Sequence, residues 1–242
     1  MRKSSPQSAP KLQVAVLSLF PEMFPGPLAH SIAAKAASDN IWAIESINLR
    51  DFATDKHRTV DDTPFGGGPG MVIKADVIDA AIESLRARDE YKTAKVIYFT
   101  PRGKKFDQAM AKDLSAQQNL ILLCGRYEGI DQRAIDKHQM IEISMGDFIL
   151  SGGELPAMMV LDAVIRLLPG TVGDAQSVLE ESFESGLLEA PHYTKPADWQ
   201  GMVVPDVLLS GHHQKIADWR KQMAETATRE RRPDLWQQYK TA

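Results

Sequence analysis

Two glycine-containing loops, each directly after an apolar strand, are the clearest candidates for a chemical site in this sequence. The apolar run 119–124 opens into Gly125-Arg-Tyr-Glu-Gly-Ile-Asp131, and the run 140–145 opens into Gly146-Asp-Phe-Ile-Leu-Ser-Gly-Gly-Glu154. Glycine has no Cβ, so the backbone N–H and C=O groups of such loops can approach a ligand closely. The two loops therefore predict a ligand site at the carboxyl edge of a parallel sheet.

Two groups of charged residues follow this stretch. The helix expected from Pro156 is apolar on nearly all sides, and Asp162 and Arg166 are its polar exceptions, at i and i+4. They form either an intrahelical pair worth roughly 0.2–0.5 kcal/mol or a site where the arginine meets an anionic partner. Glu180 and Glu181 lie in an expected loop, where carboxylates are ordinarily solvated.

The other candidate sites carry weaker signals. The chain has no Gly-x-Gly-x-x-Gly after a strand and no Gly-Lys-Ser/Thr P-loop. Gly66-Gly-Gly-Pro-Gly70 is either an anion-binding nest or a flexible loop. Cys124 closes an apolar strand without an evident activating base, which predicts a buried, inert thiol. A single cysteine and no Cys/His cluster exclude a disulfide framework and a structural zinc site.

The composition indicates an ordinary globular protein, long enough at 242 residues for one sizeable core and a small second domain. The net charge of −4 argues weakly against nucleic acid, but residues 206–242 carry seven Lys/Arg against five Asp/Glu. No uncharged apolar run approaches the ~20 residues of a membrane helix. Residues 1–10 form a polar extension without the apolar core of a signal peptide, and we expect a cytoplasmic protein.

Hydrophobic periodicity predicts alternating strands and helices, which is typical of an α/β fold with a mainly parallel sheet. Pro21 and Pro101 are expected to end the strands before them. The expected strands cover residues 12–20, 41–47, 95–100, 119–124 and 140–145, and the expected helices cover 27–37, 75–88, 106–115 and 156–168, with one more between the last two strands.

Helical periodicity fades after Pro169-Gly170 and resumes near residue 210, and Pro233 begins a last short helix. Glycine, proline, serine and acidic residues dominate the intervening stretch, as in an interdomain linker. We therefore expect two domains and a functional linker. The expected boundaries are 1–10 for the polar extension, 11–170 for the sheet domain, 171–190 for the linker and 191–242 for a small helical C-terminal domain.

Six segments, in this order, resemble one family: the bacterial tRNA (guanine-N1)-methyltransferases of the SPOUT class, the TrmD type. The resemblance implies a C-terminal trefoil knot in the sheet domain, made by the loops after the strands near residues 98, 122 and 143. Periodicity does not show such a knot, and threaded chains are very rare. The segments are Leu19-Phe-Pro-Glu-Met-Phe24, His57-Arg-Thr-Val-Asp-Asp62, Phe65-Gly-Gly-Gly-Pro-Gly-Met71, Cys124-Gly-Arg-Tyr-Glu-Gly-Ile-Asp131, Ser151-Gly-Gly-Glu-Leu-Pro-Ala157 and Pro191-His-Tyr-Thr194.

The resemblance also implies a reaction: methylation of N1 of guanosine 37 of tRNA, next to the anticodon, by S-adenosylmethionine. Strand-end loops near residues 100, 125 and 150 would suit this cofactor, whose adenine needs backbone polar contacts and a small apolar slot. Such loops also occur without a ligand. By resemblance the cofactor-binding residues are Tyr98, Phe99, Thr100, Pro101, Gly125, Tyr127, Glu128, Met145, Gly146, Asp147, Phe148, Ile149, Leu150, Gly152, Gly153 and Pro156.

Arg166 and Glu181 are the catalytic residues that the resemblance implies. It places Arg166 against guanine O6 and Glu181 at the general-base position, where the family pattern has aspartate. A glutamate with a pKa of about 4.3 is too weak a base to remove the N1 proton beforehand. Proton loss should therefore be concerted with attack, or should follow stabilisation of the charge on O6 by Arg166.

The implied partners are tRNA and a second copy of the chain, with cofactor loops from one subunit and the linker and C-terminal domain from the other. Magnesium dependence is compatible with the family, although the sequence shows no assembled metal site. Two alternatives stay open: a non-catalytic RNA-binding SPOUT-like protein, and a SPOUT enzyme acting on ribosomal RNA, which the C-terminal match disfavours. The implied tRNA-binding residues are His57, Arg58, Asp61, Asp62, Arg220 and Lys221.

Overall fold

The computed structural model describes residues 9–173 and 181–241. The chain forms two compact units, one ending at residue 173 and the other beginning at residue 174. No helix within the described ranges is long and apolar enough to cross a bilayer.

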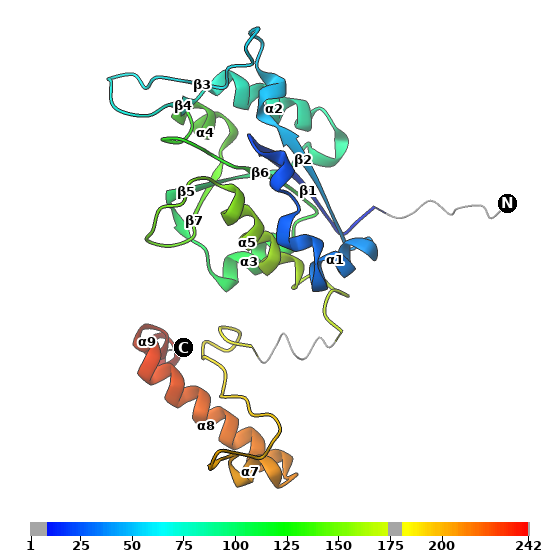
Figure 1. Ribbon diagram of the computed structural model, residues 1–242, viewed down its shortest axis with the longest axis vertical. Helices are drawn as coiled ribbons and strands as arrows, with labels where there is room; N and C mark the ends of the chain where they lie inside the picture. Colours follow the sequence, from blue (N-terminus) through cyan, green and yellow to red (C-terminus); the bar gives the residue numbers. More distant parts are fainter. Residues whose placement is uncertain (1–8, 174–180, 242) are drawn as a thin grey trace, which may run out of the picture. The chain divides into compact units, whose positions relative to one another are not determined.

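A five-stranded parallel sheet forms the centre of the first unit (Figure 1). The strands lie in the order β2-β1-β6-β5-β7, and each neighbouring pair is parallel. The predicted α/β fold with a mainly parallel sheet is therefore confirmed. The strands are β1 (Leu12–Ser18), β2 (Trp42–Asn48), β5 (Lys95–Lys105), β6 (Asn119–Leu123) and β7 (Ile141–Ser144).

Helices cover both faces of this sheet and bury its strands (Figure 1). Side chains alternate between the two faces, so that Val14 and Val16 of β1 face one helical layer and Ala15 and Leu17 face the other. Burial on both faces explains why the strand sequences are near-continuous apolar runs. One layer consists of α1 (Ser31–Ser38), α3 (Gln108–Ser115) and α5 (Glu154–Ile165), and the other of α2 (Ala75–Arg86) and α4 (Gln132–His138).

The helix expected over residues 27–37 is divided in two. His30 is extended, at φ −127° and ψ 162°, and Ser31 has a positive φ of 55°. Neither conformation continues a helical hydrogen-bond ladder, so a short turn precedes α1. The connecting short elements of this unit are η1 (Pro21–Met23), η2 (Gly26–Ala29), η3 (Leu49–Phe52), β3 (Asp61–Asp62), β4 (Val72–Ile73) and η4 (Asp89–Tyr91).

The prediction that Pro101 ends its strand is wrong, because β5 continues to Lys105. The register of β5 against β7 shifts between Phe99 and Lys104, so that Pro101 lies in an irregular stretch between two paired segments. A proline in such a bulge removes no ladder hydrogen bond. Gly103 lies in the same stretch, where a Cβ would overlap the backbone of β7.

The second unit is a small helical body with one hairpin. The hairpin lies in a stretch expected to be irregular, and its turn residues Gln200 and Gly201 have φ values of 57° and 81°. Two positive φ values are what a tight two-residue hairpin turn requires. Thr228 of the long helix is buried and accepts a 2.8 Å hydrogen bond from the backbone N–H of Leu188. The elements are β8 (Asp198–Trp199), β9 (Met202–Val203), α7 (Asp206–Leu209), α8 (His213–Arg231) and α9 (Pro233–Thr241).

Candidate active site

Three loops meet in a pocket at the carboxyl edge of the parallel sheet. One is the bulged part of β5, the second follows β6, and the third joins β7 to α5. The cavity has a volume of about 230 Å³. Fifteen of the sixteen residues predicted to bind the cofactor line it: Tyr98, Phe99, Thr100, Pro101, Gly125, Tyr127, Glu128, Met145, Gly146, Phe148, Ile149, Leu150, Gly152, Gly153 and Pro156.

Asp147 is the remaining predicted residue, and it does not line the pocket. Its side chain is 84% exposed and accepts a 2.7 Å hydrogen bond from Lys105 Nζ. The side chain thus points to solvent although its neighbours in the chain face the cavity. Four of the five lining residues that the prediction omits adjoin a predicted one in the chain, and Ile143 lies two residues before Met145. These residues are Arg126, Gly129, Ile143, Ser144 and Ser151.

Two glycines permit the close packing that shapes this pocket. A Cβ on Gly125 would lie 2.8 Å from a ring carbon of Tyr98, and one on Gly153 would lie 2.8 Å from the Cα of Cys124. The N–H of Gly153 donates a 3.0 Å hydrogen bond to the carbonyl of Gly125. The start of α5 therefore rests directly on the end of β6, and a side chain at either glycine would force the loops apart.

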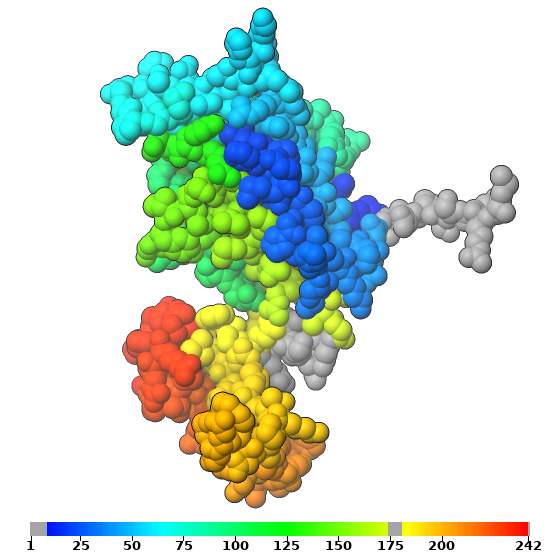
Figure 2. Space-filling view, in the orientation of Figure 1, coloured from blue at the N-terminus to red at the C-terminus, as the bar shows by residue number. Residues whose placement is uncertain are grey.

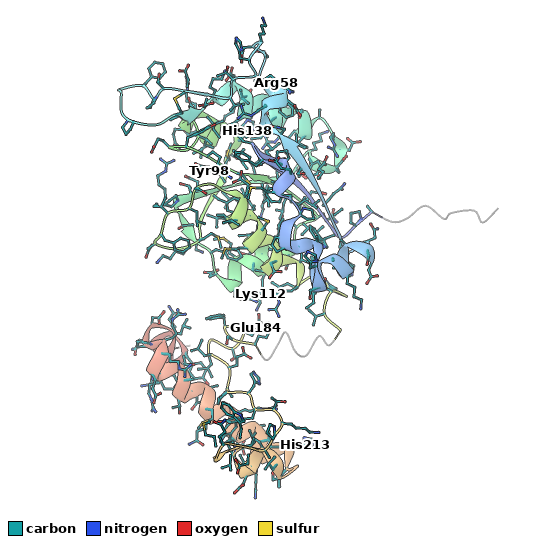
Figure 3. The ribbon with its side chains drawn as sticks, viewed as in Figure 1. Arg58, Tyr98, Lys112, His138, Glu184 and His213 are labelled. Atoms are coloured by element: carbon teal, nitrogen blue, oxygen red, sulfur yellow. The ribbon has the colours of Figure 1, made fainter. Side chains whose placement is uncertain are left out.

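The two tyrosines of the pocket have different surroundings. Tyr98, labelled in Figure 3, lies in β5 and is 4% exposed. Burial raises the pKa of its hydroxyl, so this side chain remains a neutral donor at physiological pH. Tyr127 is 51% exposed and has a φ of 59°, a backbone conformation that residues other than glycine rarely adopt. Such strained backbone concentrates at ligand sites.

A buried ion pair joins the loop after β6 to the start of α5. Glu154 is only 1% exposed, and Arg126 Nη2 lies 3.0 Å from its Oε2. Arg126 Nε donates to Oε1 at 3.2 Å, and Ser18 Oγ donates to the same oxygen at 2.7 Å. A buried carboxylate is stable only when it is paired and hydrogen-bonded. These three side chains therefore hold the loop, α5 and the end of β1 together beside the pocket.

The predicted catalytic residues lie outside this pocket. Arg166 follows the last residue of α5 and lines a separate cavity of about 170 Å³ together with His30 and Asp162. It is ten residues beyond Pro156, which corresponds to roughly 15 Å along the helix at about 1.5 Å per residue. Glu181 belongs to the second unit, where its carbonyl accepts a hydrogen bond from a backbone N–H. Arg166 is therefore not among the residues that line the cavity between the loops.

Four of the predicted tRNA-binding residues lie in one segment of the first unit. Arg58 has a φ of 54° and pairs with Asp51, while Asp61 and Asp62 form β3. The glycine-rich loop between β3 and β4 projects from this unit, in cyan in Figure 2, and Phe65 within it is fully exposed. The remaining predicted tRNA-binding residues are His57, which is exposed in the same segment, and Arg220 and Lys221, which are exposed on α8.

Cys124 is fully buried, and burial raises the pKa of its thiol well above the ordinary value. The prediction of a buried thiol is confirmed. Because the thiolate is the reactive form, this cysteine cannot act as a nucleophile at neutral pH.

Among the residues that the structure describes, Asp79 and Glu83 of α2 and His138 of α4 are close enough to hold a metal ion together. His138, labelled in Figure 3, has its Nε2 2.8 Å from Asp79 Oδ1 and its Nδ1 3.3 Å from Arg86 Nη1. A hydrogen bond from Lys137 lowers the pKa of Asp79. Two neighbouring cations disfavour a divalent ion, and the cluster instead joins α2 to α4.

Comparison with known proteins identifies relatives over nearly the whole chain. Residues 12–238 match the family described as tRNA (Guanine-1)-methyltransferase TrmD. A tRNA (guanine-N(1)-)-methyltransferase of Rhodospirillum rubrum is 57% identical over 231 residues, which cover 96% of this chain and 95% of the relative. The protein of the same name from Sphingopyxis alaskensis is 55% identical, covering 92% of this chain and 90% of the relative. The one from Wolbachia pipientis is 54% identical, with coverages of 92% and 94%. This chain therefore belongs to the TrmD family of tRNA (guanine-1)-methyltransferases.

Proposed function

We propose that this protein methylates N1 of guanosine 37 in tRNA and takes the methyl group from S-adenosylmethionine. The observation that carries the proposal is the convergence of fifteen predicted cofactor residues, from three separate loops, on one cavity. Relatives that cover more than nine tenths of the chain carry the name of a tRNA (guanine-N1)-methyltransferase. A tRNA substrate implies that the enzyme works in the cytoplasm.

The lining of the pocket suits S-adenosylmethionine. Gly125 and Gly152, which have no Cβ, line the cavity beside an apolar wall that includes Ile149 and Leu150. Adenine needs this combination, because its edge forms hydrogen bonds and its faces are apolar. The cavity of about 230 Å³ is smaller than the roughly 300–1,000 Å³ of typical ligand sites, so part of the cofactor would extend toward the substrate.

The proposal includes a trefoil knot built from the loops after β5, β6 and β7. Two close backbone approaches support it. Gly103 of β5 lies directly against the backbone of β7, and the N–H of Gly153 donates to the carbonyl of Gly125 across the ends of two loops. Glycine permits such close approaches because it has no Cβ.

Arg166 and Glu181 act on the guanine base in this mechanism. The Glu181 carboxylate would accept the N1 proton while N1 attacks the methyl carbon. S-adenosylmethionine would supply that methyl group, with its sulfur leaving as a neutral thioether. The Arg166 guanidinium stabilises the negative charge that develops on O6. Proton transfer to Glu181 and charge stabilisation by Arg166 both require a site that excludes water, because electrostatic interactions are stronger there than in water.

Arg166 supports an active site shared between two subunits. Roughly 15 Å of rigid helix separates it from Pro156 at the cofactor pocket, so a second copy must supply an arginine near the methyl group. Leu155 and Met159 of α5 are 50% and 51% exposed although most residues of this helix are apolar and buried. An exposed apolar face of this kind is typical of a subunit interface.

Any magnesium requirement would then arise with the RNA, because no described residue cluster is suited to the ion.

A methyl-transfer assay on tRNA transcripts tests the proposal. The purified protein is incubated with radiolabelled S-adenosylmethionine and a transcript that has guanosine at position 37, and a matched transcript has adenosine there. We expect label only in the guanosine transcript. Binding of the transcript without transfer would favour the non-catalytic alternative, and transfer to ribosomal RNA alone would favour the other.

A further inference from the structure

The second unit contains a pocket that the proposed chemistry does not use. Its volume of about 420 Å³ is within the range of roughly 300–1,000 Å³ for small-ligand sites. The walls are the segment 191–195, the region from the hairpin to α7, and the first half of α8, whose first residue His213 is labelled in Figure 3. The motif Pro191-His-Tyr-Thr194 thus forms one wall of a cavity, although the proposed reaction assigns it no role.

Two aromatic side chains offer flat surfaces inside this pocket. The ring centroids of Tyr193 and Trp219 are 6.2 Å apart with an interplanar angle of 57°. Ile216, Trp219 and Arg220 share one face of α8, at i, i+3 and i+4. Tyr193 is 49% exposed, so its ring is not consumed by packing within the unit. Exposed aromatic faces of this kind are stacking platforms for nucleic-acid bases.

Two cations line the same pocket, Lys195 and Arg220. Within the described part of the chain, neither side chain forms a hydrogen bond or an ion pair. Arg232 of the same unit, by contrast, is neutralised by Asp234 at 2.6 Å. Unpaired cations next to exposed rings match the chemistry of a single-stranded nucleotide, which presents a flat base and a phosphate on each side.

We infer that this pocket holds one unpaired nucleobase of the tRNA, against Tyr193 and Trp219, with its flanking phosphates at Lys195 and Arg220. The inference rests on the proposed function, because it identifies a second attachment point for the same substrate. An apolar protein segment in the pocket would leave both cations without a partner, whereas RNA neutralises them. The pocket would thus recognise the tRNA by its shape, through a base that is free to leave the stack.

The test compares pocket variants with matched controls in the full-length protein. Tyr193→Leu and Trp219→Leu keep an apolar side chain but remove a ring, and Arg220→Gln removes an exposed charge without altering the core. The control for ring loss is Tyr239→Leu, in the pair with Trp236 at 5.7 Å elsewhere in the unit. The control for charge loss is Lys215→Gln, which is on α8 but outside the pocket.

We expect each ring variant to weaken tRNA binding about tenfold, the usual effect of one lost base–aromatic stack. Arg220→Gln should weaken it less, and the salt dependence of binding should become shallower. The KM for S-adenosylmethionine should stay near the parent value, as should all constants of the two controls. Circular dichroism establishes that the ring variants are folded, and Arg220→Gln tests the site independently of any folding defect.

Transcripts that lack one base at a single unpaired position identify the occupant. One such transcript should bind the parent about tenfold more weakly but should suffer no further loss with Trp219→Leu, since both changes remove the same contact. Pocket variants that bind tRNA like an active parent would overturn the inference and leave the proposed function intact. The inference would also be overturned if the loss from a missing base and the loss from Trp219→Leu added at every unpaired position. Variants that alter only the oligomeric state would overturn it as well. An inactive parent would instead contradict the proposed function.

Discussion

Glu181 and Arg166 are assigned to different atoms of the same base, and each assignment has its own test. In the proposed mechanism Glu181 receives the proton from N1, so its basic oxygen should matter for the chemical step and little for affinity. Arg166 is proposed to stabilise the charge on O6, which should also matter mainly in the transition state. A glutamate at this position reaches one methylene further than the aspartate of the family pattern, so the carboxylate rather than its reach should be the essential feature.

Replacing Glu181 with glutamine should separate binding from chemistry. Glu181→Gln keeps the size and removes the basic oxygen, so single-turnover methyl transfer should fall by ~10²–10⁴ while cofactor and tRNA affinities stay nearly constant. Glu181→Asp should retain far more activity, and Arg166→Ala should slow the same step. The matched control is Glu184→Gln in the same segment, which should transfer at the parent rate. Transfer at the parent rate by Glu181→Gln would place the base elsewhere, with Asp61 or Asp62 next to test.

Cys124 should be unreactive in the native protein over a wide pH range. Burial raises the pKa of this thiol, so the thiolate is scarce at pH 7 and stays scarce when the pH rises to about 9, where an exposed cysteine would ionise. A thiol reagent should label the native protein at least about 100-fold more slowly than the urea-unfolded protein, because labelling requires opening. Rapid labelling of the native protein, prevented by added cofactor, would show an accessible thiol in the pocket and contradict its burial.

At the scale of elements, the junction between β6 and α5 shapes the proposed cofactor pocket. The close contact of Gly153 with Gly125 and the buried pair of Arg126 with Glu154 hold the two elements together at this point. Removing one partner of such a buried pair commonly costs about 3–5 kcal/mol. The junction is therefore rigid, and a ligand can meet preorganised backbone groups rather than mobile loops.

A side chain at Gly125 should weaken cofactor binding strongly and destabilise the fold little. In Gly125→Val the added Cβ meets the ring of Tyr98, which is a wall of the pocket. Calorimetry should show S-adenosylmethionine affinity reduced at least about tenfold, which is 1.4 kcal/mol or more. Gly173→Ala is the control, because a Cβ there meets nothing within 4 Å. Equal affinities for the parent and Gly125→Val would contradict the assignment of the pocket.

The position of the pocket could be predicted from sequence because glycine-rich loops after apolar strands are local features. The strand order β2-β1-β6-β5-β7 could not, since it depends on which distant segments pair. The pairing of Arg126 with Glu154 was equally hidden, because one residue lies in the loop after β6 and the other begins α5, and their contact is purely tertiary. The prediction for Pro101 was wrong for a related reason. Proline does not end a strand where a bulge already lacks the ladder hydrogen bond that the proline would remove.

At the scale of the whole molecule, the proposed mechanism requires two copies of the chain for one reaction. The loops predicted to bind the cofactor lie at the start of α5 and Arg166 at its end, so the length of a single helix separates the two halves of the proposed site. Each dimer would then contain two composite sites, and damage to different halves in different subunits should leave one of them whole.

Complementation between two inactive variants should reveal this sharing. Gly125→Val and Glu181→Gln chains, coexpressed with different tags and purified through both, form dimers with one intact composite site. Such dimers should have about half of the parent activity, since one of two sites is complete. Doubly tagged Glu181→Gln dimers serve as the control and should stay inactive. Complementing dimers with no more activity than either variant would mean that each site lies within one subunit.

The identity of the methylated atom tests the central claim most directly. A transcript with guanosine at position 37 is treated with the protein and methyl-labelled S-adenosylmethionine, digested to nucleosides and analysed by mass spectrometry. The account predicts that all label elutes as 1-methylguanosine, with at most one methyl group per tRNA, and that none appears when position 37 is adenosine. Label in any other nucleoside, or at a guanosine elsewhere in the transcript, would contradict it.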